Sequence, residues 1–421
     1  MRVDGRLRVP GDKSISHRAL ILAALAGQGR SRVTGILESA DVRSTAGVLR
    51  ALGHPIPALS DDMVVKGGGR RVRAPSTPLD CGNSGTTARL MAGVVAGAPI
   101  TARFVGDASL SRRPMRRIAT PLEAMGAVVE LSPGGGLPMT IHGGALRTLE
   151  WASEVASAQV KSAILLAAVM AGVPVVVDEP RPTRDHTERM LKARGVEVRV
   201  DGSRIAAAGG AELRPMDVDV PGDPSSASFF AALAAMATDG ELVIDDVCVN
   251  ATRTGFLDAL ITMGAVVEYD RQTEIGGEWV SPVVVQPGRL NGITVTDSDI
   301  PSMIDELPLL ACVAARATGA TVITGASELR VKESDRIAAV VSNLRAVGVD
   351  ATELPDGMRI AGSDRRLTGR VTTHGDHRIA MAFGILGALP GNAIAIDDPS
   401  CVDISYPAFW EDLHRVAGGG R

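Results

Sequence analysis

The feature that most constrains the fold of this chain is an internal repeat. The segment PGDKSISHRALILAALA, which begins at Pro10, is matched by PGDPSSASFFAALAAMA, which begins at Pro221. Both segments run from Pro-Gly-Asp through a short polar stretch with serines into an apolar helical pattern. Asp12 and Asp223, or the serines after them, are suited to cap these helices, because their oxygens can accept the free N–H groups of a first turn. The chain therefore restarts its own pattern near Pro221.

Weaker copies of this pattern occupy the rest of the chain. They begin at CGNSGTTARLMAGVVAG, EVASAQVKSAILLAAVMAG, SMIDELPLLACVAARATG and GDHRIAMAFGILGALPG. Each apolar helix ends in Gly or Pro-Gly, and a β-rich run follows it. In five of the six units a more polar amphipathic helix and another strand come next, whereas the last unit ends in the short helix PAFWEDLHRV. Units that cannot bury their apolar faces alone must stack on their neighbours. The pattern predicts an α/β fold of two similar domains, each with three repeated helix–strand units.

The length of 421 residues also favours two domains, because one ordinary core does not grow to this size. We place the N-terminal domain at residues 13–221. We place the C-terminal domain at residues 1–12 and 222–421, since a strand from the terminus could complete it. The alternative is a parallel sheet of generic βα units with no shared origin. The paired Pro-Gly-Asp openings and the Gly-Ala-Val-Val-Glu endings at Gly126 and Gly264 favour repeats.

Composition excludes several classes of function. A net charge of -4 and an aromatic content of 3% give no basis for nucleic-acid binding. The four cysteines are scattered without a C-x-x-C pair, which argues against a disulfide framework or zinc site and favours a reducing cytoplasm. The N-terminus lacks the apolar core of a signal peptide. The most apolar stretch, residues 163–177, is too short to span a bilayer. We expect it to form a buried helix, a turn at residues 172–174 and a strand.

Polar and basic side chains gather where the apolar helices begin. Four of the six units share this property, with Lys13, Ser14 and Arg18 in the first, Asn83, Gly85, Thr86 and Arg89 in the second, Ser157, Gln159 and Lys161 in the third, and Asp376, His377 and Arg378 in the sixth. A helix N-terminus offers free N–H donors and a partial positive charge, so it favours anions. Parallel helices in two facing domains would enclose a cleft that attracts small anionic substrates.

Familiar cofactor motifs do not occur. The sequence has no phosphate-binding G-x-x-x-x-G-K-[ST], no dinucleotide G-x-G-x-x-G after a strand, no G-x-S-x-G and no H-E-x-x-H. His374 and His377 lie close together, but the residues between them supply no third metal ligand. We therefore expect no metal and no cofactor.

Three charged segments are ambiguous taken singly. Residues 106–117 carry four arginines, which is typical of a solvated basic surface. The segment RVKESDRIAA predicts the start of a helix that is capped by Ser334 or Asp335 and carries solvated, salt-bridged charges. Asp305 and Glu306 form an acidic pair in an otherwise apolar stretch, where burial tends to raise a carboxyl pKa and suit it to proton transfer.

These residues resemble the 5-enolpyruvylshikimate-3-phosphate (EPSP) synthase family along nearly the whole chain. The segments that carry the resemblance are PGDKSISHRALILAALA, DCGNSGTTARLMAG, GDASLSRRPM, SAQVKSAILLAA, TRDHTERML, SMIDELPLLA, RVKESDRIAA, GDHRIAMAF and SYPAFWEDL. The resemblance implies an inside-out α/β barrel of the enolpyruvyl transferase type, with helices inside, sheets outside and the active site in the interdomain cleft. It also implies a cytoplasmic monomer of the shikimate pathway and a target of glyphosate.

The resemblance implies that the chain joins phosphoenolpyruvate to the 5-hydroxyl of shikimate 3-phosphate and releases phosphate, with no cofactor. Asp305 would take the hydroxyl proton, while Glu333 with Lys13 would move protons at the methylene carbon. The substrate-binding residues would be Lys13, Ser14, Arg18, Asn83, Gly85, Arg113, Ser157, Ala158, Gln159, Arg184, Asp305, Lys332, Arg336, His377 and Arg378. Arg184 would contact the phosphate of shikimate 3-phosphate, and Gly85 would leave space for phosphoenolpyruvate.

Two other classes of function fit parts of the sequence. Transfer to UDP-N-acetylglucosamine is catalysed by a related family, which typically has Lys-Asn in place of Lys13–Ser14 and a cysteine in the loop at residues 106–117. A non-catalytic repeat protein that binds phosphorylated metabolites would need no proton-transfer acids. One departure from the EPSP synthase pattern is Ile404, where many relatives carry lysine. The tail after Leu413 is expected to fray.

Overall fold

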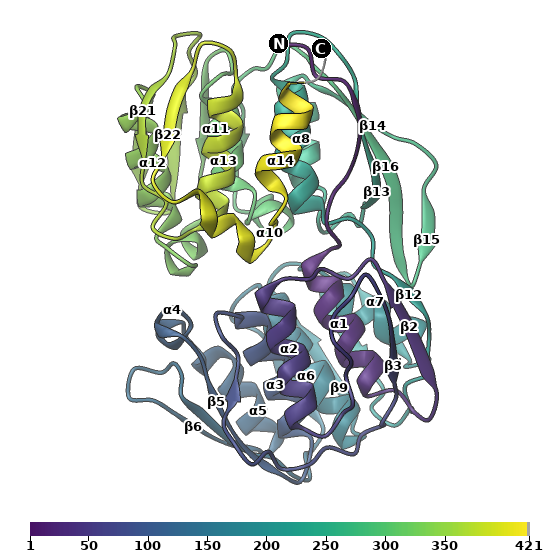
Figure 1. Ribbon diagram of the computed structural model, residues 1–421. Coiled ribbons are helices and arrows are strands. Elements are labelled where there is room, and N and C mark those ends of the chain that lie inside the picture. The colour runs from purple at the N-terminus through teal and green to yellow at the C-terminus, as the bar shows by residue number, and fades with distance from the viewer. Residues whose placement is uncertain (419–421) are drawn as a thin grey trace. The chain divides into compact units, whose positions relative to one another are not determined.

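A computed structural model describes residues 1–418 of the chain and divides them into two compact units (Figure 1). The first unit contains Met1–Pro10, Pro221–Thr273 and the chain from Trp279 on. The second contains Gly11–Val220 and Glu274–Glu278. Each unit is an α/β assembly of helices and sheets, as the repeat pattern predicted at the level of fold class.

The second unit repeats one helix–strand–helix–strand pattern three times. Its helices are α1 (Lys13–Ala24), α2 (Ala40–Ala51), α3 (Gly85–Ala96), α4 (Ala108–Arg112), α5 (Arg116–Met125), α6 (Ala158–Ala171) and α7 (His186–Ala193). Its first sheet has the order β12 (Val218–Asp219), β2 (Arg30–Thr34), β3 (Asp62–Lys66). The second has the order β4 (Leu79–Asp80), β5 (Thr101–Val105), β7 (Met139–His142), β6 (Val128–Leu131). The third has the order β10 (Val198–Asp201), β11 (Arg204–Ala207), β9 (Val175–Asp178), β8 (Leu149–Ala152).

The first unit repeats the pattern twice in full, and its third copy ends at α14 with no strand after it in the described residues. Its helices are α8 (Pro224–Ala235), α9 (Gly255–Met263), α10 (Ile300–Met303), α11 (Leu307–Ala314), α12 (Arg336–Ala346), α13 (His377–Ala388) and α14 (Phe409–Ala417), with 3-10 turns at Ser327–Val331 and Pro399–Ile404. Its first sheet has the order β1 (Gly5–Arg8), β13 (Leu242–Cys248), β16 (Glu278–Gln286), β14 (Val266–Tyr269). The second has the order β17 (Thr294–Val295), β18 (Ala320–Ile323), β20 (Gly357–Ala361), β19 (Asp350–Leu354). The third pairs β21 (Thr368–Val371) with β22 (Ala393–Ile396). Strand β15 (Thr273–Ile275) pairs with β16.

The strands that precede α1 and α8 do not pair with the strands that follow those helices, but each pairs with the strand that follows the other helix. In the second unit β4 and β8 each pair in parallel with the strand that follows their own helix, β5 and β9. Strand β1 precedes α1 but pairs in parallel with β13, where Gly5 lies opposite Leu242. Strand β12 precedes α8 but pairs in parallel with β2. Each exchanged strand thus completes the sheet of the other half's opening repeat.

Helices α3 and α6 of the second unit pack at very close range because glycine lies at their contact. A Cβ built on Gly93 would lie 2.1 Å from the backbone oxygen of Ala163, and one on Gly97 would lie 2.6 Å from that of Ala167. Nearly all residues of α6 are buried, as expected for the apolar stretch at residues 163–177. Gly172 ends the helix with a φ of 75°, and β9 follows. The helix–turn–strand prediction for this stretch is confirmed.

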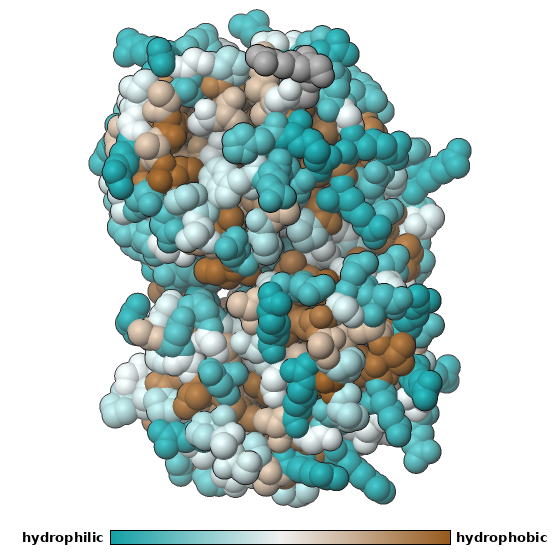
Figure 2. All heavy atoms as spheres, viewed as in Figure 1, coloured by the Kyte–Doolittle hydropathy of each residue, from teal (hydrophilic) through white to brown (hydrophobic). Residues whose placement is uncertain are grey.

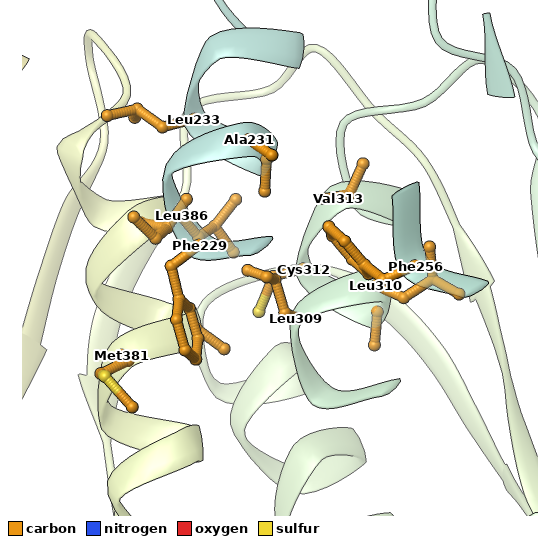
Figure 3. Packing of buried hydrophobic residues seen from close by; sticks show 14 of the residues in the cluster. Phe229, Ala231, Leu233, Phe256, Leu309, Leu310, Cys312, Val313, Met381 and Leu386 are labelled. Atoms are coloured by element: carbon orange, nitrogen blue, oxygen red, sulfur yellow. The ribbon is translucent and has the colours of Figure 1, made fainter. Parts of the chain in front are cut away.

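The core of the first unit lies among α8, α9, α11 and α13 (Figure 3). Phe229 of α8 points toward α13, where Met381 and Leu386 lie, while Leu310 of α11 lies beside Phe256 of α9. Phe229 also meets Phe409 of α14 edge to face, with ring centroids 5.6 Å apart. This contact anchors α14, which remains helical to Ala417. The prediction that the tail frays after Leu413 is therefore wrong for the residues up to Ala417. Residues 419–421 of that tail lie outside the described residues.

Surface strands alternate between buried and exposed side chains, as in β3, where Met63 and Val65 are buried and Val64 is exposed. On the face shown in Figure 2, hydrophilic side chains project furthest, with apolar patches scattered among them. No helix of the described chain, residues 1–418, is long and apolar enough to cross a membrane. All four cysteines are buried and free.

Candidate active site

The start of α1 in the second unit carries three predicted site residues, Lys13, Ser14 and Arg18. Asp12 caps the helix by accepting a hydrogen bond of 2.8 Å from the backbone N–H of Ile15, as the sequence predicted. Lys13 is the first residue of the helix, and its Nζ lies 3.2 Å from Oδ2 of Asp41 in the first turn of α2. Ser14 follows, and its carbonyl oxygen accepts a hydrogen bond from Arg18. The helix start therefore presents a half-buried ammonium group at a helix N-terminus, which suits an anion.

Arg18 is buried among uncharged partners. Its Nε donates to Oγ1 of Thr187 over 2.7 Å, its Nη2 donates to Oγ of Ser162 over 2.8 Å, and its Nη1 donates to the Ser14 carbonyl over 2.9 Å. The Ser162 and Thr187 hydroxyls also lie 2.7 Å apart. Burial lowers the pKa of Arg18 to about 10, although Glu188 opposes this shift. We call Arg18, Ser14, Ser162 and Thr187 the Arg18 site.

The starts of α3 and α6 are joined by side-chain hydrogen bonds. Ser84 caps α3 and Ser157 caps α6, which places Ala158 and Gln159 in the first turn of α6. Gln159 donates from Nε2 to Thr86 over 3.1 Å and accepts a hydrogen bond from Arg89. The polar groups predicted to open the second and third units therefore lie together.

Arg113 lies at the end of the short helix α4 and turns back toward the start of α3. Its Nη2 donates to Oδ1 of Asn83 over 2.9 Å, and Asn83 in turn donates to Asp107 over 2.6 Å. A Cβ on Gly85, the first residue of α3, would lie 3.1 Å from Nη1 of Arg89 and 3.4 Å from Nη1 of Arg113. Glycine at this place thus leaves the space in front of two guanidinium groups open. The stretch at residues 106–117 is not simply a solvated basic surface.

A buried ion triad supports the loop that carries Arg184. Lys161 of α6 lies 2.7 Å from Oε2 of Glu179 and 2.6 Å from Oε1 of Glu188. Glu179 also accepts a hydrogen bond over 3.3 Å from the backbone N–H of Thr183, which precedes Arg184. Burial opposes ionisation of Lys161, but the charges of Glu188 and Glu179 outweigh it and raise the lysine pKa. Burial likewise raises the pKa of Glu188 against the opposing charge of Lys161.

Acidic and basic side chains converge on Asp305 in the first unit. Asp305 lies in the turn between α10 and α11, and its Oδ1 is 3.2 Å from Nζ of Lys332 and 3.4 Å from Nη1 of Arg336. Nη2 of Arg336 is 2.7 Å from Oε2 of Glu333. Arg378 donates to the Asp305 carbonyl over 3.1 Å. Two carboxylates, one ammonium and two guanidinium groups therefore lie within one network, suited to proton transfer beside a bound anion.

Asp376 holds the base of this network. It is fully buried, and its two oxygens accept hydrogen bonds of 2.8 and 3.2 Å from Nε and Nη2 of Arg336. Burial alone would raise the Asp376 pKa, but the charge and hydrogen bonds of Arg336 outweigh it and lower that pKa. Burial opposes ionisation of Arg336, yet Asp376 and Glu333 raise its pKa above the ordinary value. We call Asp305, Lys332, Glu333, Arg336, Asp376 and Arg378 the Asp305 cluster.

Asp376 also caps α13, since its Oδ1 accepts a hydrogen bond of 3.0 Å from the backbone N–H of Arg378. This cap leaves His377 buried as the first residue of the helix. The cap of α12 is Asp335, which accepts from the backbone N–H of Ala338 over 3.1 Å. Ser334, the other residue considered for that cap, instead donates to Asp376 over 2.9 Å. Within residues 1–418 no group of three or more His, Cys, Asp or Glu side chains is arranged to hold a metal ion.

A family model for EPSP synthase (3-phosphoshikimate 1-carboxyvinyltransferase) matches residues 1–413 of the chain. The chain belongs to this family. A 3-phosphoshikimate 1-carboxyvinyltransferase from Alkalilimnicola ehrlichii is 49% identical over 410 residues, covering 97% of this chain and 92% of that protein. Another from a Sulfurihydrogenibium species is 46% identical and covers 99% of this chain and 98% of that protein.

Solved structures agree with the EPSP synthase assignment. An EPSP synthase from Acinetobacter baumannii is 39% identical, with a TM-score of 0.87, and the match covers 99% of this chain and 96% of that one. The enolpyruvyl transferase NikO from Streptomyces tendae is 17% identical with a TM-score of 0.78, covering 99% of this chain and 95% of that one. The second likeness shows a shared enolpyruvyl transferase fold.

Some charged residues that contact the predicted site residues, or support the loop that carries Arg184, were absent from the substrate-binding site predicted for this EPSP synthase family member. Asp41 and Glu179 lie in none of the quoted motifs, and each gains its charged partner only when separate elements pack together. Lys161 and Glu188 lie in quoted segments, and Lys161 was noted at the opening of the third unit, but their pairing with each other was not predicted. Asp376 had a usable signal, since it occupies the same Gly-Asp helix-opening position as Asp12 and Asp223. Ile404 ends the 3-10 turn that contains Cys401.

Proposed function

We propose that the chain transfers the enolpyruvyl group of phosphoenolpyruvate to the 5-hydroxyl of shikimate 3-phosphate and releases phosphate, in aromatic amino acid biosynthesis. Family membership over nearly the full length supports the reaction class. The observation that carries the proposal within this chain is the Asp305 cluster, where two half-buried carboxylates, Asp305 and Glu333, share contacts with Arg336.

The proposed binding roles divide by substrate. Lys13, Ser14 and Arg18 bind both substrates, whereas shikimate 3-phosphate is held by Ser157, Ala158, Gln159 and Arg184, with Lys332 at its ring. Phosphoenolpyruvate is surrounded by Asn83, Gly85, Arg113, Arg336, His377 and Arg378. Arginine suits these places because its planar guanidinium pairs with carboxylate or phosphate through two parallel hydrogen bonds. The open space in front of Arg89 and Arg113 at Gly85 supports this assignment.

The proposed chemistry is an addition followed by an elimination. The 5-hydroxyl oxygen forms a bond to C2 of phosphoenolpyruvate while Asp305 accepts the hydroxyl proton and a proton is delivered to C3. In the elimination the C2–O bond to phosphate breaks and a proton leaves C3, which restores the double bond. Glu333 and Lys13 move the protons at C3. The cationic groups stabilise the tetrahedral intermediate and the departing phosphate.

We further propose the finer architecture implied by the family. The two compact units act as the two three-repeat domains, with helices inside and sheets outside, and both supply residues to one active site in the cleft of the enolpyruvyl transferase fold. Closure around the substrates would exclude water and complete the site. The protein would act as a cytoplasmic monomer on its small-molecule substrates.

Phosphate release tests the proposal directly. The purified protein is incubated with phosphoenolpyruvate and either shikimate 3-phosphate or UDP-N-acetylglucosamine. We expect release only with shikimate 3-phosphate, and its loss in Asp305→Ala and Lys13→Ala. Release only with the nucleotide sugar would overturn the acceptor assignment. Release with neither acceptor would favour a non-catalytic binding protein.

A further inference from the structure

The first unit contains a second buried polar network, which contacts Arg378 through Glu306. Its members are Asp223, Ser225, Arg253 and Glu306, each less than one-tenth exposed. Asp223 and Ser225 lie at the start of α8, Arg253 precedes α9, and Glu306 precedes α11. These three helices belong to the core of the unit, so four polar side chains replace apolar packing at their ends. Burying such groups is costly unless they are paired, which makes the pairing informative.

The contacts form a continuous chain that ends on Arg378. Nη2 of Arg253 donates to Oδ1 of Asp223 over 3.0 Å and to Oγ of Ser225 over 2.9 Å. Ser225 in turn donates its hydroxyl hydrogen to Oε1 of Glu306. The same Glu306 oxygen lies 3.4 Å from Nη1 of Arg378. A serine has one hydroxyl hydrogen, so accepting from Arg253 directs that hydrogen toward Glu306.

Glu306 therefore restrains the Arg378 guanidinium from the buried side. Nη1 of Arg378 is shared between Oε1 of Glu306 and the carbonyl oxygen of Asp305. Nη2 of Arg378 lies 4.0 Å from Oδ2 of Asp305, within the Asp305 cluster. A guanidinium held at one nitrogen by a fixed carboxylate keeps its plane, which matters for pairing with a planar anion.

We propose that Glu306, oriented by Ser225 and Arg253, is a positioning residue that presents Arg378 to the carboxylate or phosphate of phosphoenolpyruvate. The inference rests on the proposed function and adds to it a residue that touches neither substrate. Glu306 acts through Arg378, so its removal weakens capture of phosphoenolpyruvate more than capture of shikimate 3-phosphate.

Steady-state kinetics of Glu306→Gln test this role. The amide retains the shape of the side chain and can still accept from Ser225, but it no longer offers a charged partner to Arg378. We expect the KM for phosphoenolpyruvate to rise roughly 10-fold, the effect of losing one charge-assisted hydrogen bond. The KM for shikimate 3-phosphate should change less than about 2-fold, because Arg378 is proposed to bind only phosphoenolpyruvate. A general loss of binding would instead raise both KM values.

Ser225→Ala provides a second variant that leaves the carboxylate in place. We expect a smaller change in the same direction, roughly 3-fold in the KM for phosphoenolpyruvate, because Glu306 loses its orienting donor. The control is Leu233→Ala in the core of α8, which should lower the melting temperature without changing the ratio of the two KM values.

The outcomes separate the two hypotheses. If the unaltered protein releases no phosphate from phosphoenolpyruvate and shikimate 3-phosphate, the proposed function fails. If it is active and Glu306→Gln and Ser225→Ala change the two KM values equally, or neither value, the positioning role is overturned. If Leu233→Ala gives the same selective rise as Glu306→Gln, loss of stability explains the effect and the role is again overturned.

Discussion

Arg18 and Arg336 are both buried arginines predicted to bind substrate, yet their hydrogen-bond partners differ in charge. Arg18 donates to two hydroxyl groups and a backbone carbonyl, and burial lowers its pKa to about 10. Arg336 contacts three carboxylates, and these raise its pKa against the effect of burial. Uncharged partners orient Arg18 while leaving its positive charge for an incoming anion. Carboxylates hold Arg336 in place, and its charge in turn lowers the pKa of Asp376.

If the carboxylates of the Asp305 cluster carry proton transfer, Asp305→Ala should have the largest effect on catalysis. We expect kcat to fall about 1,000-fold, which is within the range for loss of a general base. Phosphate release under saturating substrates measures this change. Asp305→Asn keeps the side-chain volume and should be similarly impaired, so an Asn variant of near-normal kcat would contradict the assignment.

Asp376→Asn tests whether Arg336 depends on carboxylate pairing. Asparagine can still cap α13, but it leaves a buried guanidinium with less compensating charge. Breaking such a pair typically costs about 3–5 kcal/mol, and we expect a loss of this size in the free energy of unfolding. Urea denaturation followed by circular dichroism measures it. An unchanged midpoint would mean that the remaining contacts of Arg336 suffice.

Thr187→Val tests the uncharged partners of Arg18. Valine has the shape of threonine but offers no oxygen to Nε of Arg18, and a hydrogen bond to a charged group contributes about 1.5–3 kcal/mol. Since Arg18 would then be less well oriented, we expect the dissociation constant for shikimate 3-phosphate to rise roughly 10-fold or more. Isothermal titration calorimetry measures this constant. Thr187→Ser should retain most of the affinity, and equal losses in Ser and Val variants would argue against the hydroxyl contact.

The smallest expected effect is the loss of folding stability at low pH that is caused by His17 in α1. Burial lowers the pKa of His17 to about 3, so the ring is neutral in the fold, where its Nδ1 lies 2.7 Å from Oγ1 of Thr45. An unfolded histidine with an ordinary pKa near 6.5 takes up a proton below that pH, which favours unfolding. The stability present above pH 6.5 is therefore lost as the pH falls toward 3, by at most about 1.4 kcal/mol per pH unit.

His17→Gln should reduce the loss of stability between pH 6.5 and pH 5.5. Thermal unfolding of both proteins at the two pH values gives this difference. Asp376 responds lower on the pH scale, because its pKa is held below the usual carboxyl value by Arg336. An unchanged pH dependence in His17→Gln would assign the acid sensitivity to other groups.

Local features of the fold could be predicted because they depend on residues that are close together in the sequence. Asp12 and Asp223 cap their helices as expected, since a cap needs only an oxygen a few residues before a free N–H. The helix, turn and strand of residues 158–178 follow from an apolar run interrupted at Gly172 and Pro174. The α/β class follows from the six-fold recurrence of this local pattern.

Side-chain pairing across the fold could not be derived from these local patterns. Ser334 was an equally good cap for α12, but folding brings it to Asp376 and leaves the cap to Asp335. The Glu306–Ser225 contact likewise joins two different repeats, and the Lys161 triad joins α6 to the end of β9 and to α7. The catalytic and binding roles assigned to the site residues remain predictions. Family resemblance supplied those roles, whereas periodicity and capping supplied only their positions at helix starts.

The exchange of β1 and β12 has a consequence for synthesis on the ribosome. Strand β1 is made before α1, but its partner β13 begins only at Leu242, after Gly11–Val220 has been made, which is all of the second unit except Glu274–Glu278. Strand β12, which completes the sheet of β2, is made at the end of this segment. A nascent chain stalled near residue 220 would therefore carry most of one unit and one unpaired strand, whose free backbone groups can pair with a neighbouring chain. Translation to β13 removes that hazard.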